Sequence, residues 1–121
     1  MNKVALTVLF FLSTSAVADV LIPRSTSYDK GRYYLIHAER KGKIIKSISK
    51  RIGVDSVGYT ITKTNCNTMK MKGLGYSEIS VDDIKENESK WFDLVSGSSK
   101  SDLANFVCAK YVKDGTYDES K

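Results

Sequence analysis

The residues with the clearest chemical potential are two cysteines, Cys66 and Cys108, which lie 42 residues apart in a chain with one histidine, His37. A metal site needs clustered ligands and a catalytic thiol needs a base beside it, so a single histidine gives little support for either. His37 lies in an apolar stretch, where a lone histidine is more often a hydrogen-bonded structural residue than a ligand. In an oxidising compartment two cysteines have one possible pairing. We therefore predict a structural Cys66–Cys108 disulfide, with metal ligation and a catalytic thiol as the alternatives.

Two further groups of residues could suggest hydrolysis. Asp82 and Asp83 are neighbours in an acidic stretch, but adjacent carboxylates do not define the opposed pair that acid–base hydrolysis requires. Ser98 and Ser99 follow Gly97 without the G-x-S-x-G context of a hydrolase nucleophile, and helix capping accounts for them. We therefore expect a protein that is not an enzyme and that uses no cofactor and no metal.

Residues 1–18 have the layout of a secretory signal peptide: a basic start, an apolar run and small residues that end at Ala18. The apolar run is far shorter than the roughly 20 residues needed to span a bilayer, and no later stretch is long and apolar enough. We therefore expect cleavage after Ala18 and no membrane span in the mature chain. Residue 19 is Asp19, not the cysteine of a lipid-anchored precursor, so we expect a soluble periplasmic or secreted protein.

The mature chain is short enough for one domain, residues 19–115, and ends in a polar tail, residues 116–121, that we expect to be mobile. Consecutive stretches rich in β-branched and aromatic residues predict a meander of antiparallel strands. These strands are expected at residues 32–40, 43–52, 56–65, 66–74 and 90–95, with a short edge strand at 20–22. Alternation along the first long strand separates Tyr33, Leu35 and His37 from Tyr34, Ile36 and Ala38.

A helix is predicted after Gly97, because Ser98 or Ser99 can cap its start and Asp102 falls in its first turn. Its apolar stripe comprises Leu103, Phe106, Val107 and Tyr111. Gly115 is the expected stop, and residues 73–89 are expected to form an acidic loop with one helical turn at 81–85. The predicted fold class is α+β: an antiparallel β-sheet meander with a C-terminal amphipathic helix packed on it and one disulfide.

The formal net charge is +5, and the charges are segregated along the chain. Residues 40–51 contain only basic charges, whereas acidic residues dominate positions 78–93. If strands 43–52 and 56–65 pair, one sheet face becomes basic and could attract a protein or an anionic envelope component. The candidate binding residues are Arg40, Lys43, Lys46, Lys50 and Arg51. The alternative is a solvated face whose lysines discourage aggregation through the sheet edge.

Four segments of the second half of the chain occur in a distinctive order. They are the strand that enters Cys66 (YTITKTNC), the Trp91 strand (KWFDLV), the Gly97-Ser98-Ser99 turn and the helix that ends in FVCAKY. This order resembles the surface-adhesin E family of small exported bacterial proteins, over about half of the mature chain. The resemblance implies an antiparallel sheet with a C-terminal helix held by a disulfide. It also implies extracellular binding, because the family takes its name from a lipid-anchored adhesin of host matrix proteins, although Asp19 replaces the anchoring cysteine here.

The leading hypothesis is a non-enzymatic exported binding module, adhesin-like, that recognises its partner through the basic sheet face. The alternative is a periplasmic immunity or inhibitor protein that binds a toxin or an enzyme through the acidic loop at residues 78–88. Nucleic acid is not an expected partner, because an exported domain rarely meets it. The sequence carries no signal for an oligomeric state.

Overall fold

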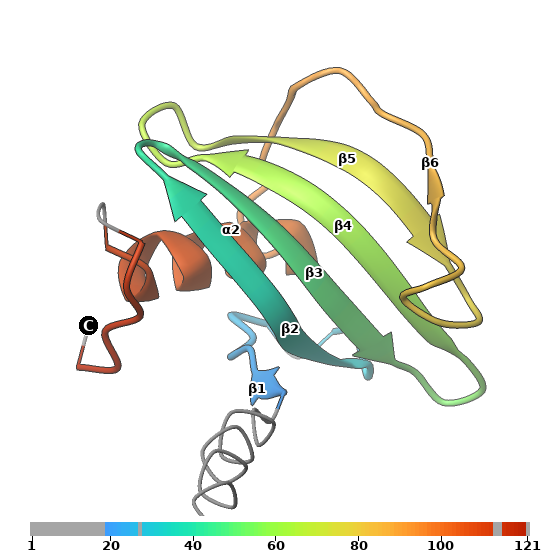
Figure 1. Cartoon of the computed structure of the whole chain (residues 1–121). Helices are drawn as coiled ribbons and strands as arrows, with labels where there is room; N and C mark the ends of the chain where they lie inside the picture. Colours follow the sequence, from blue (N-terminus) through green and yellow to red (C-terminus); the bar gives the residue numbers. More distant parts are fainter. Residues whose placement is uncertain (1–18, 27, 113–114, 121) are drawn as a thin grey trace, which may run out of the picture.

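The computed structural model describes residues 19–26, 28–112 and 115–120, so the predicted signal peptide and its cleavage point after Ala18 lie outside the described residues. The described chain forms one antiparallel sheet and one helix, α2 (Ser99–Lys110). The strands are β1 (Val20–Leu21), β2 (Arg32–Lys41), β3 (Ile44–Ile52), β4 (Val57–Asn65), β5 (Lys70–Ser77), β6 (Lys85–Glu86) and β7 (Phe92–Asp93). Neighbouring strands from β1 to β6 pair in chain order, and β7 also pairs with β5. The α+β fold class predicted from the sequence is confirmed (Figure 1).

The hydrophobic core lies between the sheet and α2, which crosses one face of the long strands (Figure 1). Alternation along each strand sends every second side chain to this inner face, and the helix stripe covers those side chains. The buried core consists of Ile22, Leu35, Ile45, Met71, Leu103, Ala104 and Val107. No helix of the described residues covers the opposite sheet face, which we call the outer face. No helix in the described part of the chain is long and apolar enough to cross a membrane.

A β-bulge in β2 overturns the predicted faces of that strand. The register shifts between Leu35, which pairs with Ser49, and His37, which pairs with Ile48. One extra residue inserted in a strand reverses the faces of all residues beyond it. Ala38 therefore lies on the inner face with Leu35, and His37 lies on the outer face, where its side chain is 58% exposed. The expectation that His37 shares a face with Leu35 was wrong.

The connection between β4 and β5 is longer than the sequence indicated. Residues 66–69 form a turn, so the strand predicted at 66–74 runs instead over β5, Lys70–Ser77. Asn65 sets the turn, because its Oδ1 accepts hydrogen bonds from the N–H groups of Asn67 and Thr68 at 2.9 and 3.1 Å. Met69 completes the turn in the left-handed region, with φ 54°. This Asn-based turn replaces the first part of the predicted strand.

The last predicted strand, residues 90–95, pairs only at β7, and its side chains alternate between the core and the surface. Phe92 and Leu94 pack against the core, whereas Trp91 and Val95 are exposed. The chain then turns into α2. Ser98 is the N-cap, as one of the two predicted caps, and its Oγ accepts a hydrogen bond from the N–H of Ser101 at 3.1 Å.

The helix stops earlier than predicted. It ends at Lys110, and Tyr111 has an extended backbone that forms a bridge with Tyr117. The chain doubles back there, since the N–H of Asp118 donates to the carbonyl of Lys110 at 2.6 Å. Gly115, the predicted stop, has φ 94° and belongs to the reversal after the helix. The mobility of the tail stays a prediction.

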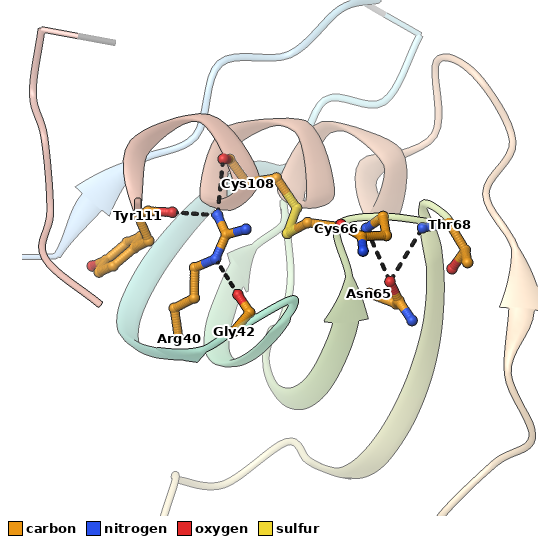
Figure 2. Close-up of a disulfide and its surroundings, with 8 residues drawn as sticks. Arg40, Gly42, Asn65, Cys66, Thr68, Cys108 and Tyr111 are labelled. Carbon is orange, nitrogen blue, oxygen red and sulfur yellow. Dashed lines mark hydrogen bonds between the residues drawn. A yellow bond between two sulfur atoms is a disulfide. The ribbon is translucent and has the colours of Figure 1, made fainter. Parts of the chain in front are cut away.

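The predicted disulfide is confirmed. The sulfurs of Cys66 and Cys108 lie 2.06 Å apart, and the bond joins the turn after β4 to the last part of α2 (Figure 2). Both thiols are therefore consumed, and the described residues contain no free cysteine. Metal ligation and thiol catalysis by these cysteines are excluded while the bond is intact.

Candidate functional site

The five basic residues predicted as a binding set do not share one surface. Arg40 and Arg51 belong to the inner face, because they pair with Ile45 and Tyr33, respectively. Lys46 and Lys50 belong to the outer face, and Lys43 lies exposed in the turn between β2 and β3. Alternation along β2 and β3 accounts for this division.

Arg40 holds the C-terminal end of α2. Its Nη1 donates to the carbonyl oxygens of Tyr111 at 2.6 Å and Cys108 at 3.4 Å, and its Nε donates to that of Gly42 at 2.7 Å (Figure 2). The last carbonyls of a helix lack partners within the helix and carry partial negative charge. A guanidinium placed there satisfies them, which gives Arg40 a structural role beside the disulfide.

Arg51 is also engaged. Its Nη2 donates to Oδ1 of Asp29 at 2.7 Å, and its Nε donates to the hydroxyl of Tyr33 at 2.9 Å. Tyr33 in turn donates to Asp29, and so does the N–H of Gly31. Hydrogen bonds from Arg51, Tyr33 and Gly31 lower the pKa of Asp29. This network fastens the segment before β2 to β3.

A second ion pair fastens the same segment to the helix. Nε of Arg24 lies 2.7 Å from Oδ2 of Asp102, whose side chain is only 5% exposed. Burial alone would raise the pKa of Asp102, but hydrogen bonds from Arg24 and from Ser25 outweigh burial and lower it. Asp102, which the sequence placed in the first turn of the helix, therefore binds the N-terminal segment.

The outer face carries a row of three lysines across three neighbouring strands. Lys46 of β3 lies directly opposite Lys63 of β4, and Lys63 lies directly opposite Lys72 of β5. Lys72 pairs with Glu88 at 2.5 Å and lies 5.2 Å from the ring of Trp91. Lys46 and Lys63 have no ion-pair partner among the described residues. We call Lys46, Lys63 and Lys72 the lysine row.

An apolar pair lies on one side of the lysine row. Ile48 lies opposite Ile61 in the next row of the outer face, and both are half-buried although no helix in the described part of the chain covers them. Lysine stems can cover apolar surface while the ammonium groups stay in water. Lys50, which lies beyond these isoleucines, is less available, because its Nζ pairs with Asp19 at 2.8 Å. The outer face therefore combines unpaired positive charge with apolar area.

The acidic loop lies along the β5 edge of the sheet. Glu88 is engaged by Lys72, which lowers the pKa of its carboxyl, and Asp83 accepts a hydrogen bond from Ser80 at 2.7 Å. Asp82 and Glu86 are exposed. The loop thus neutralises one end of the lysine row, whereas Lys46, which lies opposite Glu39 of β2, and Lys63 form no ion pair within the described residues. Sequence reasoning left Lys63 and Lys72 out of the binding set, although the period of two along each strand could have placed them opposite Lys46 once the register was known.

Comparisons of the chain with protein-family models, with curated proteins and with solved structures find no match. Within the described residues, no cluster of three His, Cys, Asp or Glu side chains could hold a metal ion. Function is therefore inferred from the surfaces themselves.

Proposed function

We propose that this protein is an exported, non-enzymatic binding module that recognises an acidic surface of a partner protein through the outer face of its sheet. The observation that carries the proposal is the direct pairing of Lys46 with Lys63, continued by Lys72. Like charges directly opposite each other destabilise a sheet. An acidic partner would relieve this repulsion, so the arrangement favours binding. The resemblance to the surface-adhesin E family supports a binding role of the same kind.

The composition of the outer face fits a protein partner. The lysines supply attraction over a distance of about one Debye length, roughly 8 Å at physiological salt. The half-buried pair Ile48 and Ile61 supplies apolar area that a partner would cover on docking. An anionic envelope polymer could use the lysines, but it would gain little from the isoleucines. Binding should weaken as salt is raised.

The test is capture from an envelope extract by the immobilised, oxidised protein. The double variant Lys46→Glu/Lys63→Glu should lose the captured partner, because both unpaired charges of the row are reversed. Lys30→Glu is the control for charge reversal at another surface, since Lys30 is exposed and lies outside the sheet, in the segment before β2. Unchanged capture by the double variant would refute the proposal. Capture that survives protease treatment of the extract would identify an anionic polymer as the partner.

The exposed carboxylates Asp82 and Glu86 carry the second candidate, an immunity or inhibitor protein that binds a toxin or an enzyme through the acidic loop. The variant Asp82→Asn/Glu86→Gln separates the two functions in the same capture assay. Loss of the partner in this variant, with retention in the lysine variant, would assign recognition to the acidic loop. The leading proposal predicts the opposite pattern.

A further inference from the structure

A groove on the inner side of the sheet lies apart from the lysine row. It has a volume of about 390 Å³. It opens between the start of α2 and the end of the sheet where β3 ends, β4 begins and β5 ends. Its walls include Tyr33, Arg51, Tyr76, Ser99 and Lys100. It continues into a narrow inner pocket of about 50 Å³ that shares Tyr33, Arg51, Ser99 and Lys100. A volume of this size is within the range that holds small ligands, roughly 300–1,000 Å³.

The groove exists because its floor lacks side chains. At Gly58 an added Cβ would lie 2.7 Å from the hydroxyl of Tyr76, so the Tyr76 side chain would have to move. Gly73 is different: an added Cβ would meet nothing closer than Oγ of Ser89 at 3.7 Å. Glycine inside a strand weakens the strand, and it often marks a place where a ligand approaches the backbone. Packing within the protein therefore accounts for Gly58 but not for Gly73.

Positive potential converges on this groove from α2. Ser98 accepts the N–H groups of Ser101 and Asp102, so the first two N–H groups of the helix, from Ser99 and Lys100, have no acceptor in the described part of the chain. Free N–H groups at a helix N-terminus favour anions. The side chain of Lys100 is exposed at the same place.

An independent observation comes from the inner pocket. Thr62 lines this pocket and is only 1% exposed, yet its Oγ1 has no hydrogen-bond partner among the described residues. A buried hydroxyl without a partner is costly, by about 1–3 kcal/mol for such groups in general. A polar group that enters the pocket from the groove would satisfy it.

We infer that this groove binds a small organic anion that carries a phosphate or a carboxylate. The anionic group sits at the N–H groups of Ser99 and Lys100, a polar atom of the ligand reaches Thr62, and the body of the ligand lies over Gly73. The carboxylates that contact groove residues do not compete for this position. Asp29 is engaged by Arg51, and Glu78 accepts a hydrogen bond from the hydroxyl of Tyr76 at 3.3 Å.

The test uses three probes that share a sugar ring and differ in charge: glucose 6-phosphate, glucuronate and glucose. Each is titrated into the oxidised protein while the backbone amide signals are followed by NMR. We expect saturable shifts of the Ser99 and Lys100 amides with at least one anionic probe and none with glucose. The stronger anionic probe decides between a phosphate and a carboxylate. No saturable shift with either anion would overturn the inference.

Two variants make the test specific. Lys100→Glu should weaken binding of the anion by about tenfold or more, because it removes a charge-assisted contact. Gly73→Val should block the groove while its circular dichroism and melting temperature stay close to those of the parent, since the new side chain has room. Lys41→Glu, with the same charge change at the other end of the sheet, should bind as the parent does. Equal binding by all three variants would overturn the inference and would leave the proposal for the outer face untouched.

Discussion

Arg40 and Arg51 are basic in the sequence, yet in the folded chain their guanidinium groups serve the protein itself. Arg40 bonds the carbonyls at the end of α2, and Arg51 bonds Asp29. Both belong to the inner face, whereas Lys46 and Lys63 stay free of ion pairs within the described residues. A basic residue whose charged group is already bound within the protein therefore has a structural role, whereas one without an ion-pair partner can bind another molecule.

Arg40→Ala should lower the free energy of unfolding by about 2 kcal/mol, because it removes hydrogen bonds from a charged donor to the last helix carbonyls. Lys41→Ala, an exposed neighbour, should change it by no more than about 0.5 kcal/mol. Urea denaturation of the two variants measures both values. Equal stabilities would contradict the structural role assigned to Arg40, and capture of the partner should be unaffected in the folded Arg40→Ala variant.

The carboxyls of Asp29 and Asp102 predict a dependence of stability on pH. Both pKa values are lowered in the folded chain from an ordinary value of 3.8. As pH falls, the unfolded chain binds these protons first, so the stabilisation is complete above about pH 5 and declines below about pH 4. Urea denaturation across this range should show the decline in the parent and a smaller one in Asp29→Asn/Asp102→Asn. An identical decline in both proteins would contradict the assignment.

At the element scale, α2 is held to the sheet at both ends. Arg24 and Asp102 hold its first turns through the N-terminal segment, and Arg40 and the disulfide hold its last turn. Between them the helix stripe covers a core of small and medium side chains. Disulfide reduction should therefore loosen the C-terminal end of the helix before its start.

Reduction of the disulfide, or the variant Cys66→Ser/Cys108→Ser, should lower the free energy of unfolding by about 4 kcal/mol for a loop of this length. The reason is that the bond restricts the unfolded chain. Urea denaturation with and without a reductant measures the loss, and the serine variant should not respond to the reductant. A parent protein equally stable when reduced would contradict this role.

Much of this architecture follows from local pattern. Period-two alternation predicted the long strands, and the Ser98 cap and apolar stripe predicted α2. The bulge at Ile36 could not be predicted. Apolar residues occur on both faces of this strand, so the sequence pattern does not show where an extra residue is inserted. The turn after Asn65 was also missed, since Met69 is not a residue type that usually signals a left-handed backbone.

The candidate sites were less accessible to sequence reasoning, because both depend on register. The lysine row appears only when Lys46, Lys63 and Lys72 are aligned across three strands. The groove depends on Gly58 and Gly73 lying beneath the start of α2, far away in sequence. Glycines inside two neighbouring strands were the available signal, and they were not interpreted.

At the scale of the whole molecule, the two sheet faces differ in kind. The inner face carries the helix, the core and the groove, whereas the outer face presents the lysine row beside the apolar pair Ile48 and Ile61. The acidic loop along the β5 edge compensates Lys72 and leaves the rest of the row exposed to a partner. The formal net charge of +5 would strengthen attraction to acidic surfaces at low salt.

The most direct measurement of which surface is used is lysine footprinting by acetylation and mass spectrometry, with and without envelope extract. Lys46 and Lys63 should become protected when the partner binds, while Lys30, which lies outside the sheet, should be acetylated equally in both samples. Each lysine thus reports on its own surface in a single experiment. Unchanged acetylation of Lys46 and Lys63 in the partner-bound protein would contradict the account.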